Sequence, residues 1–339
     1  MSELGDAVTL LDIQRRLDPN ENIDSRIAEL LTETNEVLEF LPWKTSNQTM
    51  SELITVRNSE PSGEWFQYNE GFTTGKSTTT QQTEVCGMLG RYSEIDYEML
   101  KLNNFDKMFR FSEEKAFVSG LSKDMAEAFF YSNHDLNAKK PHGLSPRYSA
   151  ISSVETNIGY NVLSGEGSGE DITSVWLVGF SPETVYGIYP KGTKPGLKIE
   201  DLGRDTKTEN GKMREVVKSY FTWYCGFAVK DWRYAVRIAN IDKSDLATAG
   251  DTTDTSCNLI KLMIQAIDRI PPDLPVRLAF FARNHVHTAL KVKLLEKGNL
   301  WLNMEDFTTA GSIVRKKLSF MGIPVCRVDR LSDAESIVT

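Results

Sequence analysis

Residues 105–132 read FDKMFRFSEEKAFVSGLSKDMAEAFFYS, a stretch without proline in which large apolar residues recur at steps of four. They are Phe105, Phe109, Phe117, Leu121, Met125 and Phe129, with Ala116, Gly120 and Ala128 alongside. Residues four apart share one face of a helix, so the pattern predicts one long amphipathic helix with Asn104 as its N-cap. The charged residues Glu113, Glu114, Lys123, Asp124 and Glu127 are expected mostly on the other faces. At 1.5 Å per residue the helix would be about 42 Å long, enough to span a domain and support several layers.

The composition is that of a soluble globular protein. The chain has 339 residues, 40% hydrophobic and 25% charged, which suggests about two structural units with a buried core. A net charge of −8 disfavours a basic face for sequence-specific nucleic-acid binding. The N-terminal residues lack the basic and apolar regions of a signal peptide, and no apolar run reaches the length of a membrane span. We therefore expect a cytosol-like compartment and no membrane partner.

The segments before the long helix differ in character. Residues 1–44 form an arm with two short amphipathic helices, Val8–Arg16 and a second from Asp24 to Leu41, which need a partner surface. Residues 45–90 are rich in threonine and glutamine and carry three strand-like runs, Leu53–Arg57, Glu64–Tyr68 and Lys76–Val85. They predict a long β-hairpin. Because a lone hairpin is marginal in water, Trp65, Phe66 and Tyr68 should pack elsewhere, on their own domain or on another subunit.

The segments after the helix divide into a β-rich and an α+β part. Four runs dense in β-branched and aromatic residues predict a sheet over 174–241: Ser174–Phe180, Val185–Tyr189, Val216–Val229 and Trp232–Ile241. A polar linker at 243–256 precedes an α+β unit with helices at 259–270 and 284–297 and strands at 276–282, 300–302, 317–320 and 323–328. The chain thus divides into an arm (1–44), a hairpin (45–90), a domain at 91–250, an α+β domain at 251–330 and a tail (331–339).

No segment carries a recognisable catalytic, cofactor or metal site. Glu70–Ser77 approaches a P-loop, but its first position is Glu70 instead of glycine, and neither a strand nor a helix flanks it, so a hairpin tip is favoured. Gly165–Gly169 follows a loop and precedes a strand, which favours a mobile turn. His285 and His287 diverge by about 200° on a helix, which is poor for one metal ion. The cysteines, Cys86, Cys225, Cys257 and Cys326, are scattered and are expected to be buried free thiols.

Eight short motifs carry a resemblance that runs through nearly the whole chain. They are LLDIQRRLDP (10–19), CGML (86–89), FSEEKAF (111–117), GLSPRY (143–148), SVWLV (174–178), GIYPKG (187–192), DWRYAVRIANI (231–241) and GIPV (322–325). In this order they resemble the major capsid proteins of epsilon15-like short-tailed bacteriophages, which have the α+β HK97-type capsid fold. The resemblance implies a structural protein that self-assembles as pentamers and hexamers into an icosahedral shell around double-stranded DNA.

The resemblance also assigns roles to the segments. Residues 45–90 would be the extended loop that lies over a neighbouring subunit, 91–250 the peripheral domain with its spine helix (105–132) and β-sheet (174–241), and 251–330 the axial domain. Trp65, Phe66 and Tyr68 become candidate inter-subunit contacts. Further partners would be a portal and cement or scaffolding proteins; the location would be the virion, after synthesis in the host cytoplasm. No residue match supports a covalent cross-link.

Two other functions stay open at this point. The same fold also forms encapsulin-like nanocompartments that enclose enzymes, and a cytosolic enzyme of unknown activity is the third interpretation. Closed particles would exclude the enzyme, and nucleic-acid content would separate a phage head from a nanocompartment.

Overall fold

The computed structural model describes residues 36–102, 107–209, 211–247, 259–295, 302–309 and 313–339. The predictions for Val8–Arg16, Asn104, Phe105 and Cys257 lie outside these residues. Cys86, Cys225 and Cys326 are buried and free, as expected.

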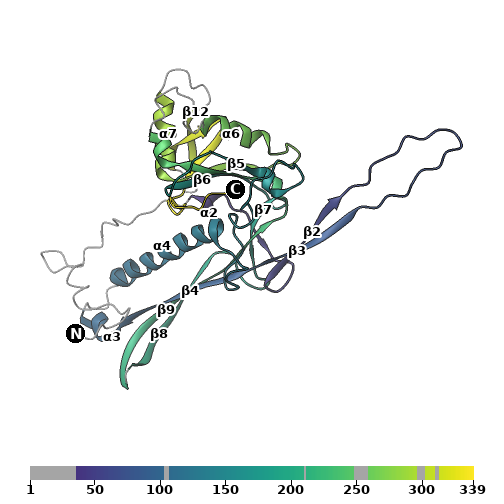
Figure 1. The fold of residues 1–339 in the computed structure, drawn as a ribbon. Helices are drawn as coiled ribbons and strands as arrows, with labels where there is room; N and C mark the ends of the chain where they lie inside the picture. Colours follow the sequence, from purple (N-terminus) through teal and green to yellow (C-terminus); the bar gives the residue numbers. More distant parts are fainter. Residues whose placement is uncertain (1–35, 103–106, 210, 248–258, 296–301, 310–312) are drawn as a thin grey trace.

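The predicted long helix is confirmed as α4, Lys107–Tyr131. It lies along strands β4 (Gly87–Asp96) and β9 (Lys212–Val229) in Figure 1. Its packed face carries Leu121, Met125 and Phe129, all buried, while the ring of Phe117 stacks on Phe221 with centroids 5.4 Å apart.

Two details of the helix differ from the predicted pattern. Ala116 and Gly120 are exposed, so the buried apolar stripe is narrower than expected. Glu113 is buried instead of lying on an outer face. The reason is positional: Glu113 lies one turn before Phe117 and therefore on the face that meets the sheet.

A large sheet forms the centre of the molecule, with strand order β12-β13-β14-β11-β6-β7-β9-β4. These strands are β12 (Leu302–Thr309), β13 (Ile313–Phe320), β14 (Ile323–Arg327), β11 (Arg277–Ala282), β6 (Ile172–Phe180) and β7 (Val185–Tyr189), followed by β9 and β4. Four more strands join it from the side: β1 (Trp43–Thr45), β5 (Val162–Ser164), β8 (Leu197–Glu209) and β10 (Ala235–Asp242). The runs predicted at 174–180, 185–189, 216–229 and 232–241 are confirmed as strands, the last beginning with the short turn η2 (Trp232–Tyr234).

Strand β6 is buried along its whole length because both of its faces are covered. On one face Trp176 and Val178 join the core formed with Met125 and Phe129 of α4. On the other face Leu177 joins the core of the α+β unit. A strand buried on both faces reads as a continuous apolar run, which is why the sequence predicted it well.

The α+β unit contains helices α6 (Leu259–Asp268) and α7 (Asn284–Leu295), which cover the face of the sheet opposite α4. Both helices pack on the same core as Phe280 and Phe320, whose rings meet edge to face at 6.0 Å. The remaining short elements are α3 (Tyr97–Leu102), η1 (Ile158–Asn161) and α5 (Lys243–Ala247). Helix α5 begins the segment that was predicted to be a polar linker.

Two long strands were not predicted. β4 crosses the boundary placed at residue 90, and β8 pairs with β9 to form a long ribbon that extends beyond the helix (Figure 1). β8 has a polar and largely exposed sequence, and β4 mixes buried and exposed residues without a clear alternation. Both strands are held by pairing with β9, which lies more than a hundred residues after β4.

The described residues at the two ends of the chain belong to the core. In the predicted arm, α2 (Val37–Phe40) buries Val37 and Phe40, and the ring of Phe40 meets Phe281 edge to face at 6.1 Å. Strand β1 pairs in parallel with β7. In the predicted tail, Leu331 and Val338 are buried.

In the glycine-rich run Gly165–Gly169, which was predicted to be a mobile turn, Gly165 and Gly167 pack against the backbone at the end of β10. The backbone N–H of Gly165 donates to the carbonyl of Ala239 (2.7 Å), and that of Gly167 to the carbonyl of Asn240 (2.9 Å). A Cβ on Gly167 would lie 2.7 Å from the Asn240 oxygen, so glycine is needed for this close approach.

Candidate inter-subunit contact surface

A two-stranded hairpin projects from the body of the molecule (Figure 1). It consists of β2 (Ser51–Ser59) and β3 (Thr78–Val85), paired antiparallel and separate from the large sheet. The predicted strand at Glu64–Tyr68 is wrong: these residues lie in the irregular loop 60–77 that joins β2 to β3. Pro61, which has no N–H to donate, follows the end of β2 and is consistent with pairing that ends there. The P-loop-like residues 70–77 lie in the same loop and lead directly into β3, which confirms the interpretation as a hairpin tip.

Four large aromatic side chains are exposed in this loop, which we call the hairpin tip. The relative exposures of Trp65 and Tyr68 are 103% and 101%, and those of Phe66 and Phe72 are 62% and 68%. The rings of Phe66 and Phe72 lie 5.3 Å apart. Within the described chain, therefore, the tip aromatics contact little besides each other. Phe72 was not among the predicted contacts, although it lies in the same loop as the three residues that were.

A second apolar surface lies on the face of the β4–β9 ribbon that points away from α4. Tyr92 is directly opposite Tyr220, and their rings stack with centroids 4.4 Å apart. Met88 is directly opposite Tyr224 on the same face, because side chains two residues apart point the same way along a strand. Met88 and Tyr92 are exposed. We call these four residues the ribbon patch; it could not be predicted from the sequence without the strand β4.

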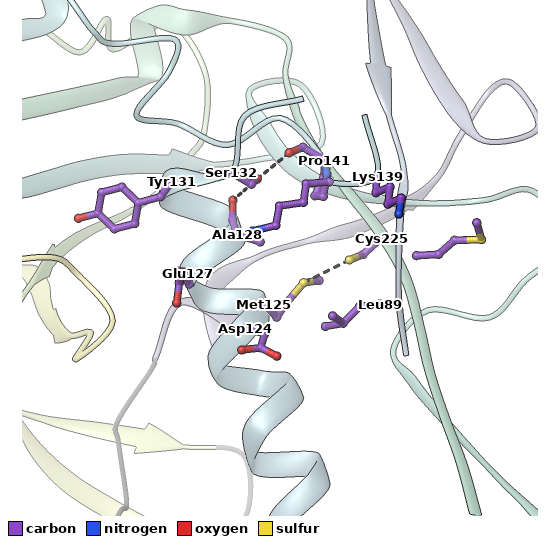
Figure 2. Close-up of a pocket in the computed structure, with 13 residues that line it drawn as sticks. Leu89, Asp124, Met125, Glu127, Ala128, Tyr131, Ser132, Lys139, Pro141 and Cys225 are labelled. Atoms are coloured by element: carbon purple, nitrogen blue, oxygen red, sulfur yellow. Dashed lines mark hydrogen bonds between the residues drawn. The ribbon is translucent and has the colours of Figure 1, made fainter. Parts of the chain in front are cut away.

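A cavity of about 360 Å³ lies between α4, β4 and the loop at 139–141. Figure 2 shows the residues that line it. Its floor includes Met125 and Cys225, whose sulfur atoms lie 3.2 Å apart. Burial raises the pKa of the Cys225 thiol, so the thiol stays protonated at neutral pH and is a poor nucleophile. The charged groups of the lining, Asp124, Glu127 and two lysines, lie around this apolar floor (Figure 2). The cavity thus offers a packing site more readily than a catalytic one.

His285 and His287, the two histidines closest in sequence, lie on helix α7. His285 lies beside Asp333, with 3.4 Å between Nδ1 and Oδ1. Burial lowers the pKa of His287. Within the described ranges there is no group of three or more histidine, cysteine or acidic residues placed to hold a metal ion. In that same part of the chain, no helix has the length and apolar character needed to cross a membrane.

Comparisons with solved structures find similar proteins among phage capsids. The structure of bacteriophage Epsilon15 matches with a TM-score of 0.79 and 26% identity, covering 100% of both chains. The capsid of bacteriophage JBD30 matches with a TM-score of 0.52 and 9% identity, over 89% of this chain and 92% of that one. A weaker similarity, with a TM-score of 0.45 and 9% identity, links the chain to the holo-SrpI encapsulin complex from Synechococcus elongatus PCC 7942, over 69% of this chain and 97% of that one.

The structural matches agree with the fold class expected from the resemblance, an α+β fold of the HK97 type. A comparison with curated proteins finds no match. A family model described as major capsid protein GP7 matches residues 18–339, nearly the whole sequence. The chain therefore belongs to the major capsid protein GP7 family.

Proposed function

We propose that this chain is the shell subunit of a bacteriophage head and assembles as pentamers and hexamers into an icosahedral shell around double-stranded DNA. The observation that carries the proposal is the family match over residues 18–339, with similarity to the Epsilon15 structure along the whole chain. On this proposal the chain has a structural role and no catalytic one. It is made in the host cytoplasm and located in the virion, beside a portal and cement or scaffolding proteins.

The proposed domain roles follow the described elements. Residues 91–250, with α4 and most of the large sheet, would form the peripheral domain, and 251–330, with α6 and α7, the axial domain. Residues 45–90 would be the extended loop. Its hairpin would begin at β2 and end at β3, and the residues that follow β3 would already belong to the ribbon of β4 and β9.

The hairpin tip is the proposed contact with a second copy. The projecting hairpin has no apolar layer that could cover Trp65, Phe66, Tyr68 and Phe72. Exposed aromatic residues of this size mark contact surfaces. The ribbon patch offers a surface of the same chemistry on the neighbouring subunit. Because a shell repeats each contact many times, even a weak contact of this kind contributes strongly to assembly.

The experiment compares assembly with subunit folding. A Trp65→Ala, Phe66→Ala double variant should keep the circular dichroism and melting of the parental unassembled subunit, yet sediment as free subunits or fragile particles. Leu136→Ala is the control, since Leu136 is an exposed apolar residue that is not part of the hairpin. A double variant that melts early but assembles normally when folded would refute the proposed contact.

The particles themselves test the wider proposal. Electron microscopy of the purified protein should show closed icosahedral shells, and particles from infected cells should contain nuclease-protected double-stranded DNA. Particles that enclose an enzyme and no DNA would support the nanocompartment instead. A protein that never forms closed particles would refute both shell functions.

A further inference from the structure

Two buried carboxylates face each other at the base of the hairpin. Glu52 on β2 is directly opposite Glu84 on β3, and their relative exposures are 4% and 2%. Like charges directly opposite each other destabilise a strand pair, and burial removes the water that would screen them. The hairpin can therefore keep this base only if cations or hydrogen-bond donors from the body hold both carboxylates.

Arg147 supplies the main cation. Its Nη1 donates to Oε1 of Glu84 at 2.5 Å and its Nη2 to Oε2 at 2.6 Å, which makes a bidentate pair. The Arg147 side chain is only 6% exposed. Its Nε also donates to the carbonyl of Gly143 (3.0 Å), and Nη2 to that of His142 (3.2 Å). The loop after α4 thus fixes the guanidinium in place, and the guanidinium binds the hairpin through Glu84.

That loop is itself tied to the end of the long helix. The N–H of Gly143 donates to the carbonyl of Ser132 at 2.8 Å, and the N–H of Leu144 donates to the carbonyl of Phe129 at 3.0 Å. Through Arg147, the direction of the hairpin is therefore coupled to α4.

Glu52 is held less firmly. It accepts from the backbone N–H of Asn47 (2.6 Å) and from the Tyr186 hydroxyl (3.3 Å), and the Lys44 ammonium lies 3.7 Å away. Lys44 is half-exposed, so its attraction is screened by water. Of the charged groups described around the two carboxylates, Arg147 is the one that is both buried and bidentate.

Beyond Glu52 and Glu84, the hairpin makes few apolar contacts with the body of the molecule. Ile54 is buried in a small cluster with residues of β7 and β9, and Val56 is only partly buried. Next to Val56 a cavity of about 390 Å³ separates the hairpin from Ile158 and Trp232 of the body. The hairpin consequently has room to swing toward this cavity if the Arg147–Glu84 ion pair is lost.

We propose that Arg147 is a positioning residue that fixes the direction in which the hairpin leaves the body. The proposal rests on the proposed function, in which the hairpin tip meets a second copy of the chain. From Glu84 to Thr78 the strand covers about 20 Å, so a swing of about 20° moves its end by about 7 Å. A displacement of that size takes the aromatic side chains out of register with any partner surface.

The test measures the hairpin direction in the full-length, unassembled subunit. Nitroxide labels at Thr79→Cys and Asn137→Cys, in a Cys257→Ser background, report the distance from hairpin to body by double electron–electron resonance. Thr79 lies about 17 Å along the strand from Glu84, so in Arg147→Met we expect the distance distribution to shift or broaden by up to about 6 Å. Arg147→Lys, which keeps the charge but loses the fork, should give an intermediate width. Arg233→Met is the control, because Arg233 pairs with Asp231 on the exposed surface.

A second variant separates positioning from stability. Glu84→Gln with Arg147→Met removes both charges of the buried pair and leaves Glu52 as it is in the parent, so it should regain the parental melting temperature but keep the broad distance distribution. A narrow, parental distribution in this folded double variant would overturn the proposal, as would one in Arg147→Met itself. A broad distribution combined with parental shell assembly would instead support the positioning role and refute the role of the hairpin in assembly.

Discussion

Replacing Glu335 by alanine should strongly destabilise the folded subunit, because it removes the carboxylate that compensates a buried guanidinium. Glu335 lies in the C-terminal segment, and its Oε2 accepts from Arg237 Nη2 at 2.8 Å, with both side chains 5% exposed or less. The hydroxyls of Tyr131 and Ser174 also donate to this carboxylate. Burial raises the pKa of Tyr131, so its hydroxyl keeps the proton that it donates.

The magnitude follows from what the substitution leaves behind. Arg237 would keep only neutral partners, Ser174 Oγ at 3.1 Å and the carbonyl of Tyr148 at 2.8 Å. Removing one partner of a buried ion pair costs about 3–5 kcal/mol because the other charge stays buried. A cavity of about 560 Å³ beside Glu335 is also lined by Tyr131 and Arg237, so water can reach these two groups and we expect little beyond that range. Glu335→Gln keeps an acceptor and should cost less.

Urea unfolding of the unassembled subunit, followed by tryptophan fluorescence, measures this loss. Trp176 is a local reporter, since the Arg237 guanidinium lies 5.2 Å from its ring centroid. Glu183→Ala is the control: its pair with Lys230 is solvent-exposed, so its removal should cost about 0–1 kcal/mol. A loss in Glu335→Ala no larger than that of the control would show that the C-terminal segment does not compensate a buried charge.

Four further predictions concern the helix, the loop after it and His287. Leu121→Asp places a charge in the buried face of α4 and should cost several kcal/mol, seen as insoluble or unfolded subunits; soluble, assembling protein would contradict the burial. Gly120→Ala should raise stability by about 0.5–1 kcal/mol, because Gly120 is exposed in a helix and its Cβ would meet no atom. Gly143→Ala, whose Cβ would lie 2.7 Å from the Ala128 carbonyl, should lower stability in the same melting experiment. Burial lowers the pKa of His287, so the unfolded chain binds more protons in acid and stability should fall as the pH drops below about 6.5; His287→Gln should flatten that fall in urea midpoints.

The accuracy of the sequence predictions depended on how many faces of each element are buried. α4 and β6 are recognisable because their buried positions are occupied by apolar residues, at helical spacing in α4 and in a continuous run in β6. β8 and β4 carry no such pattern, because much of their surface is in contact with water. Both are held in the sheet by pairing with β9. The C-terminal segment reads as a polar tail for a related reason: the burial of Glu335 depends on Arg237, 98 residues earlier.

The same reasoning explains what was and was not predicted of the candidate contact surface. Trp65, Phe66 and Tyr68 stand out by residue type in a polar segment, and the structure leaves them exposed, as a contact surface requires. The ribbon patch needs the register that brings Tyr92 against Tyr220, 128 residues later. The base of the hairpin is the more telling case, because Glu52 and Glu84 look like ordinary surface residues until the strands are paired. Only then do they become two buried charges that need compensation. Arg147 compensates Glu84 from the loop after α4, and backbone hydrogen bonds tie that loop to the end of the long helix, so the hairpin that carries the contact is coupled to α4.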